Sequence, residues 1–184
     1  MLTDALDDPD VSVRRRALEV TAAWAAHPAS EPAGDPPAEY ASRAGGPRAT
    51  EPEQDGRQQD GRTVLAGVVI QLTADPAVAE IAAFALGELG VADPAVEATL
   101  RALATGHDDP LVRESAVAAL GSLGVGLDAV LSATGDIAAV RRRAVVALAA
   151  FDGEQVDRAL ERALGDRDWQ VRQIAEDLLQ DPPG

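Results

Sequence analysis

The feature that most constrains the fold of this chain is a short pattern that recurs five times without internal gaps. Each copy has an alanine four residues after a valine, and four of the five copies have a leucine eight residues after it. The last three spacings, of 34, 28 and 31 residues, are typical of stacked two-helix units, and the first, of 65, fits one such unit plus an insertion. The five valines are Val13, Val78, Val112, Val140 and Val171.

Local signals within the repeat indicate helices. Asp109 precedes Pro110, which places a carboxylate cap before a proline at the first helical position, and Gly121 and Gly124 follow as stop signals. The residues between them have apolar or small side chains at the spacing of one helix face. We therefore predict an all-α fold, an α-solenoid that winds as a right-handed superhelix. The expected first helices are at about 62–73, 94–105, 126–134 and 153–164, and the expected second helices are at about 10–26, 75–88, 110–122, 137–150 and 168–180.

The spacing of the repeats predicts four segments. Residues 1–27 form a first, incomplete repeat, residues 62–180 form four repeats, and residues 181–184 are a tail. Residues 28–61 form an acidic, Pro- and Gly-rich insertion without Val, Ile, Leu, Met, Phe or Trp. A segment with so little to bury cannot offset the entropy of ordering, so we expect it to be disordered. It is either a spacer or a docking segment centred on Tyr40.

The pattern Asp-Pro-x-Val-Arg-x-x-Ala, followed by Ala-Leu-Gly, resembles HEAT-like repeats of the phycobilisome lyase type. In that family the aspartate before the second helix and the arginine after the valine interact between neighbouring repeats. The resemblance implies such a ladder here, interrupted at Ala79 and Ile137. The implied ladder residues are Asp10, Arg14, Asp109, Arg113, Arg141, Asp168 and Arg172.

Composition restricts the classes of function. The net charge is −15, all 16 basic residues are arginine, and this acidic surface repels nucleic acid and anionic membranes. High-salt adaptation and a GC-rich genome both remain as explanations. There is no cysteine, which excludes disulfides and thiolate metal sites. No signal peptide or membrane span is visible, so a cytoplasmic location is expected.

Candidates for catalysis or metal binding have simpler structural explanations. His27 and His107 lie at helix ends in unrelated repeat positions, and neither belongs to a metal-binding motif. Carboxylate pairs such as Asp108 and Asp109 fall at repeat turns, where helix capping accounts for them. We expect no enzyme activity, no metal and no cofactor. Family resemblance alone leaves a bilin lyase-like enzyme, or its accessory subunit, as the alternative.

Two arginine triplets, at residues 14–16 and 141–143, occupy the same position in their repeats. Because second helices usually line the concave face in this family, the triplets predict a groove for an acidic partner. Nucleic acid is the alternative ligand, although the net charge argues against it. A purely structural explanation is that the arginines of the triplets neutralise nearby aspartates. The candidate partner-binding residues are Arg15, Arg142, Phe84, Val146 and Trp169.

These observations favour a non-enzymatic scaffold or adaptor that binds another protein. Solenoid repeats expose an extended surface and contact only their neighbours, which suits protein recognition. The exposed terminal repeats would also allow a homo-oligomer.

Overall fold

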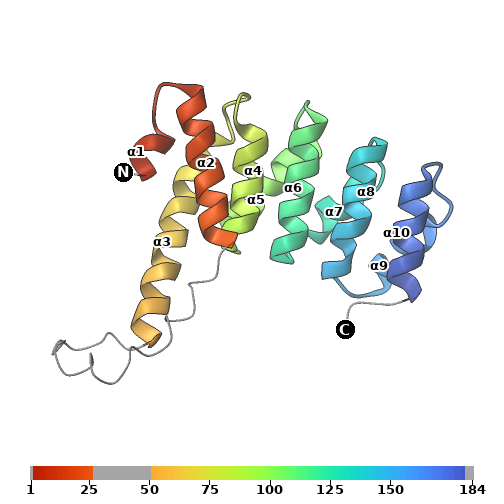
Figure 1. The fold of residues 1–184 in the computed structure, drawn as a ribbon. Coiled ribbons are helices and arrows are strands. Elements are labelled where there is room, and N and C mark those ends of the chain that lie inside the picture. The colour runs from red at the N-terminus through yellow and green to blue at the C-terminus, as the bar shows by residue number, and fades with distance from the viewer. Residues whose placement is uncertain (1, 27–50, 181–184) are drawn as a thin grey trace, which may run out of the picture.

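The computed structural model describes residues 2–26 and 51–180, and this part of the chain is an all-helical array of two-helix repeats (Figure 1). The prediction of an all-α solenoid is confirmed. The helices are α1 (Leu2–Leu6), α2 (Val11–Ala26), α3 (Glu51–Leu72), α4 (Ala79–Leu89), α5 (Pro94–Gly106), α6 (Pro110–Leu123), α7 (Leu127–Ala133), α8 (Ala138–Ala147) with the 3₁₀ turn η1 (Leu148–Ala150), α9 (Glu154–Ala163) and α10 (Trp169–Gln180).

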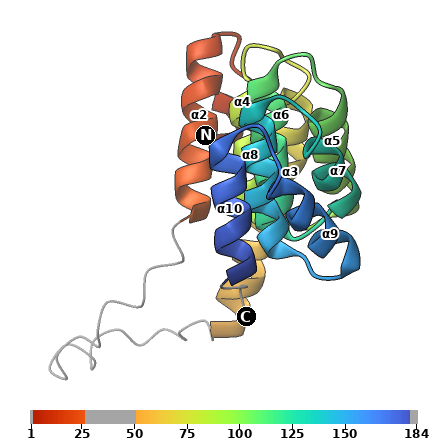
Figure 2. The same ribbon diagram turned by 90° about the vertical axis from the view of Figure 1, so that its right-hand side faces the viewer.

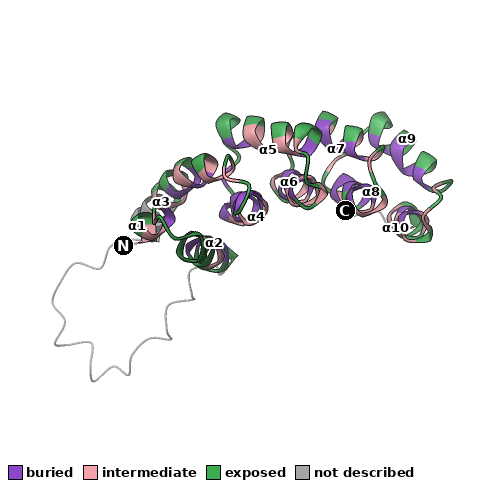
Figure 3. Ribbon diagram, turned by 90° about the horizontal axis from the view of Figure 1, so that it is seen from above, coloured by how far each residue is buried: buried purple, intermediate pink, exposed green. Residues whose placement is uncertain are grey.

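The helices form two layers. The second helices of the repeats, α2, α4, α6, α8 and α10, lie side by side along the inner side of a shallow arc, and the first helices lie along its outer side (Figure 3). Seen from the α10 end, α5, α7 and α9 form a separate row to the right of the second helices (Figure 2). Buried side chains fill the space between the layers, so the inner surface is formed by one face of each second helix.

Helix starts and stops follow the chemistry of their caps. The Asp109 carboxylate accepts a hydrogen bond from the amide of Leu111 at 2.9 Å, with Pro110 at the first helical position, and α6 ends at Gly124 with φ of 64°. Helix α4 begins four residues later than predicted. The reason is that Asp75 starts a separate turn, in which the Val78 amide donates to the Asp75 carbonyl at 3.1 Å.

The predicted end of the insertion is also wrong. Helix α3 begins at Glu51, so residues 51–61 of the expected disordered insertion are helical. Glu, Gln and Arg, which are good helix formers, make up most of this stretch, and Pro52 stands near its start. Such a stretch needs no apolar face of its own when it extends a helix that is already packed. The rest of the insertion, including Tyr40, and also His27 and the tail 181–184, lies outside the described residues.

Small residues set the distance between neighbouring second helices. A Cβ at Gly87 would lie 2.9 Å from the Cα of Ala119, and one at Gly121 would lie 2.7 Å from the Cβ of Ala147. Leu86, Leu120 and Leu148, each eight residues after a repeat valine, fill the space beneath and are fully buried. The abundance of alanine and glycine thus serves close helix packing. Among the described helices none is long and apolar enough to cross a membrane.

Candidate protein-binding groove on the inner surface

Arginines at the start of the second helices connect successive repeats. The Arg113 guanidinium reaches back to the carbonyl of His107 at 2.8 Å. It also reaches forward to the Asp136 carboxylate, with Nε to Oδ2 at 2.7 Å and Nη2 to Oδ1 at 2.8 Å. Each arginine of this kind therefore fixes its own turn and holds the turn of the next repeat in register.

The same arrangement recurs at two other junctions. Arg141 makes a two-pronged contact with Asp166 at 2.8 and 2.7 Å and donates to the carbonyl of Asp136 at 2.8 Å. Its side chain is only 6% exposed. Arg14 pairs with Asp75 at 2.5 Å. The guanidinium groups lower the pKa of Asp136 and Asp166, while the pKa of Asp75 is lowered first by the Ala77 amide and then by Arg14.

Three of the four predicted ladder arginines, Arg14, Arg113 and Arg141, bind a carboxylate of the next repeat. The fourth, Arg172, donates to a carbonyl of its own turn, and the predicted aspartates are not the ion-pair partners. Asp10, Asp109 and Asp168 accept bonds from amides two residues ahead and cap their own helices. The carboxylates that reach the arginines are Asp75, Asp136 and Asp166. These three aspartates stand three to five residues before the valines of their repeats. In addition, the turns that hold Asp8, Asp108 and Asp166 each carry a second aspartate. Spacing alone therefore does not select the aspartate that binds the arginine.

The two predicted interruptions have different outcomes. Ala79 occupies the arginine position in α4 and has no donor, so the junction between α4 and α6 lacks this ion pair. At Ile137 the expected interruption is wrong, because Asp136, one residue earlier, pairs with Arg113. Arg172 takes the same position in α10 and donates to the Asp166 carbonyl at 2.7 Å.

The lowered pKa values of Asp136 and Asp166 predict a specific pH dependence. Because the folded-state pKa lies below the unfolded value of about 3.9, the unfolded state binds more protons in the acid range, and these groups stop stabilising the fold as pH falls. We expect the stability difference between the wild type and a double variant, Asp136→Asn with Asp166→Asn, to be largest above about pH 5 and to shrink below about pH 4. Urea titrations across this range measure it. A stability difference that does not depend on pH would contradict the role of these carboxylates. The other titrating groups are the same in the wild type and the double variant, so their contribution to the pH dependence largely cancels.

The inner surface is hollowed between α6, α8 and α10. Two adjoining grooves of about 370 Å³ each share Val146 and Arg143 in their walls. The groove toward α10 is completed by Glu114, Ala139, Arg142 and Ile174. The groove toward α6 is floored by small residues, which are Ala118, Gly121, Ser122, Ala147, Ala149 and Ala150.

Of the predicted partner-binding residues, the structure brings together only two, Arg142 and Val146. Phe84 is 43% exposed and occupies the position of Val146, but on α4, outside this groove. Arg15 lies on α2, which is separated from α8 by α4 and α6. Trp169, 65% exposed at the start of α10, does not line the groove either.

The sequence prediction missed Arg143 and Ile174 as groove residues. Both stand three residues after their valines, so both face the inner surface, and that shared offset is the signal that could have found them. Arg143 pairs with Glu114 on the preceding second helix at 3.5 Å.

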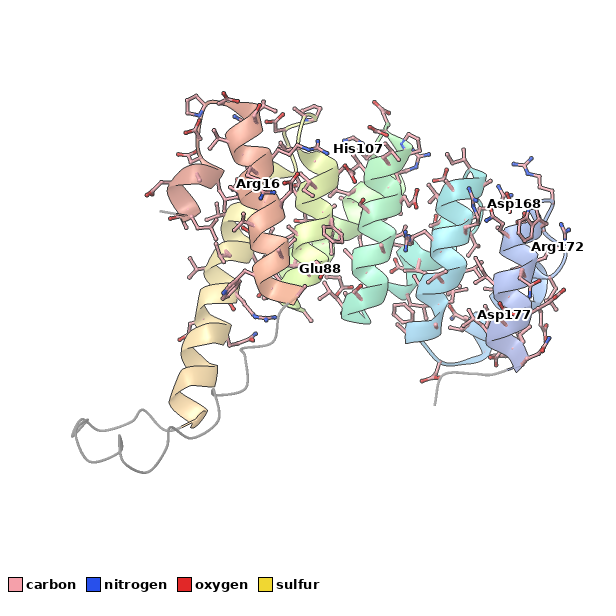
Figure 4. All side chains as sticks on the ribbon, viewed as in Figure 1. Arg16, Glu88, His107, Asp168, Arg172 and Asp177 are labelled. Carbon is pink, nitrogen blue, oxygen red and sulfur yellow. The ribbon has the colours of Figure 1, made fainter. Side chains whose placement is uncertain are left out.

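Glutamates neutralise most of the triplet arginines that face the inner surface. Arg15 lies 3.9 Å from Glu80 on α4, and Arg16 lies 2.8 Å from Glu19. Other acidic side chains, including Glu88 on α4 and Asp177 on α10, are also on this side of the array (Figure 4). Arg142 differs, because its hydrogen-bond partners among the described residues are the neutral Ala138 carbonyl and Gln170 side chain. The inner surface is therefore mixed in charge, with its least compensated cation in the groove.

Side chains suited to metal binding do not cluster in the part of the chain that the structure describes. No group of three or more His, Cys, Asp or Glu side chains there could hold a metal ion. The ring of His107 accepts a hydrogen bond from the Asp109 amide at 3.1 Å, which gives it a structural role in the turn before α6 (Figure 4).

Comparison with known proteins places this array in context. A family model described as HEAT repeats matches residues 65–133, from α3 to the end of α7. No curated protein matches the chain. Paired helices with the same valine and arginine positions continue beyond the match, in α8 to α10. The chain is therefore similar to HEAT repeats over residues 65–133, and its two-helix repeats continue past that match.

Proposed function

We propose that this protein is a non-enzymatic scaffold or adaptor that binds a segment of another protein in the groove between α6, α8 and α10. The observation that carries the proposal is the pair of adjoining grooves that share Val146 and Arg143. HEAT repeats commonly mediate protein interactions, and a groove on the inner side of a solenoid suits an extended or helical peptide.

The groove lining defines the chemistry of the partner. Val146, 45% exposed, and the half-buried Ile174 offer an apolar seat for one side chain. Arg142 has neutral partners, and the 3.5 Å pair of Arg143 with Glu114 is long enough to exchange for a better acceptor. We infer a short segment that carries an acidic residue close to an apolar anchor.

The other two functions have less support. The arginine triplets of α2 and α8 are separated by α4 and α6, and Arg15, Arg16 and Arg143 face glutamates, so they do not form a continuous path for a phosphate backbone. A bilin lyase-like activity rests on family analogy alone. A cytoplasmic location remains a prediction.

Selection from a displayed library of random peptides tests the proposal. The wild type serves as bait, with Val146→Arg as the matched variant and Glu161→Arg, on the exposed face of α9, as the control. We expect enriched peptides to carry an acidic residue near an apolar one. Their affinity should fall about tenfold or more with Val146→Arg, because that change fills the apolar seat, and should be unchanged with Glu161→Arg.

Enriched peptides that bind Val146→Arg as well as they bind the wild type would place the site elsewhere. Failure to enrich any peptide over a bait-free selection would argue against a peptide-binding scaffold. Circular dichroism of each variant checks that the helices are intact.

A further inference from the structure

Helix α2 exposes a side whose equivalents are buried in the α4, α6 and α8 repeats. Val13 is 38% exposed, whereas the repeat valines of α4, α6, α8 and α10 are at most 1% exposed. Val20 is 43% exposed, whereas Ala119 and Ala147 at the equivalent position are 3% and 6% exposed. In the later repeats the preceding second helix covers these positions. The first repeat therefore presents the receiving half of a repeat junction.

This receiving half contains a groove. An open hollow of about 520 Å³ between α1 and α2 is lined mainly by Leu2, Ala5, Val13, Ala17 and Val20, with Arg16 at its border. At the inner junction between α8 and α9, Val145 of the preceding helix lines the corresponding hollow, beside Ala159 and Val171. The groove between α1 and α2 thus has the form of a site for a side chain from a preceding helix.

The opposite end of the array presents the donating half of a junction. Arg172 makes the backward bond to its own turn, as Arg113 and Arg141 do, but has no carboxylate partner among the described residues. It lies on the side of α10 away from α8 (Figure 4). Leu179 is 40% exposed, whereas Leu120 and Leu148 at the same position are fully buried.

A matching acceptor stands at the receiving end. The Asp10 amide donates to the Asp8 carboxylate at 2.8 Å, just as the Asp168 amide donates to the Asp166 carboxylate at 2.8 Å. Asp8 stands five residues before Val13, and Asp166 stands five residues before Val171. Asp8 therefore occupies the position from which Asp166 accepts the two-pronged contact of Arg141.

A second pair of charges is also complementary. Arg143 in α8 faces the preceding helix, where it pairs with Glu114. Arg16 has the same position in α2, and its side chain is 75% exposed. On α10 the residue that matches Glu114 is Gln173, and Glu176 lies one helical turn beyond it. Glu176 has the repeat position of Val145, which is buried in α8. A copy docked on α2 would bring Glu176 toward Arg16.

We propose that two copies of this chain associate head to tail. The α10 side of one copy docks against the α1–α2 groove of the next, with Arg172 bound to Asp8 of the second copy and Leu179 packed toward its Val20. Both halves of the contact lie on the same chain at opposite ends, so the interface is heterologous and can extend beyond a dimer. The α10 residues of this contact, Arg172 and Leu179, do not line the inner groove, to which α10 contributes Ile174, so the inference does not depend on the peptide-binding proposal.

Sedimentation velocity over a concentration series tests this association with two single-end variants. Val20→Glu blocks the receiving end, and Arg172→Glu reverses the charge of the donating end. We expect the wild type to form larger species as its concentration rises. Each variant alone should associate about tenfold or more weakly, because it lacks one half of every junction.

Mixing the two variants gives the decisive result. The Arg172→Glu chain keeps an intact receiving end and the Val20→Glu chain keeps an intact donating end, so an equimolar mixture should form a one-to-one dimer and nothing larger. This dimer would also show that both variants are folded. Glu161→Arg is the control and should assemble like the wild type.

Three results would overturn the proposal. One is a wild type that stays monomeric across the series. Another is an Arg172→Glu variant that still associates while Val20→Glu does not, which would indicate contact between two α1–α2 ends. The third is an equimolar mixture that associates no better than either variant alone.

Discussion

Replacement of Arg141 by alanine is expected to lower the free energy of unfolding by about 2–4 kcal/mol. Arg141 is only 6% exposed and Asp166 is 15% exposed, so the change leaves a carboxylate with little solvent and without its cation. It also removes the bond to the Asp136 carbonyl, which holds the turn before α8. Urea denaturation followed by circular dichroism measures the loss.

Arg158→Ala is the matched control for this change. Arg158 pairs with Glu154 within α9, but the two side chains are 61% and 76% exposed. An exposed pair four residues apart on a helix contributes about 0.5 kcal/mol or less, so this variant should unfold close to the wild type. Equal losses in the free energy of unfolding for Arg141→Ala and Arg158→Ala would show that the ion pair between repeats stabilises the fold no more than an exposed pair does.

Gly121→Ala is expected to lower the free energy of unfolding by about 1–2 kcal/mol, because overpacking outweighs the gain in helix propensity. The added methyl would lie 2.7 Å from the Cβ of Ala147 and 3.0 Å from its Cα. One of these contacts is with backbone, so α6 and α8 must move apart. Gly121 also lies in the floor of the inner groove, so the change should alter peptide binding as well as stability.

Gly67→Ala provides the opposite expectation, because Gly67 is a helical glycine with open space around it. Gly67 lies within α3, and a Cβ there would meet nothing within 4 Å. Alanine should therefore raise the free energy of unfolding by about 0.5–1 kcal/mol, through helix propensity and a less flexible unfolded chain. Thermal melts of both glycine variants test the pair. A stabilising Gly121→Ala would contradict the close approach of α6 and α8.

The ladder and the groove belong to one structural arrangement. Arg141 holds α8 against the turn before α10, and Gly121 lets α8 approach α6 closely. The inner groove lies between these three helices and has walls from each of them. Its shape therefore depends on the two junctions that we expect to be the most sensitive to substitution.

Most helix boundaries could be predicted from the sequence because they depend on local chemistry. Asp109 with Pro110 starts α6 and Gly124 ends it, and both signals act within a few residues. The start of α3 at Glu51 differs from the prediction because a stretch without apolar residues gives no helical periodicity in the sequence. A polar stretch can extend a helix whose packed part begins further along the chain, and composition alone does not reveal this.

The candidate site was less predictable, because it depends on which side chains from different helices meet. Arg142 and Val146 share the groove, as the repeat pattern predicts, because both come from α8. Phe84 and Arg15 come from other helices, and the distance between repeats keeps them apart from the groove. Ile174 joins the groove only because α10 packs beside α8.

The sequence by itself determined the repeat, the order of helices and the arginine at each ladder position, because periodicity and capping act over a few residues. Only the tertiary structure decided which aspartate each arginine binds. Several repeat turns offer two carboxylates, and only the position of the neighbouring repeat selects Asp166 over Asp168. The tertiary structure also decided that the two ends of the array carry complementary halves of one junction. Val13, Val20 and Leu179 are exposed at these ends, whereas the residues at the same positions of the inner repeats are buried.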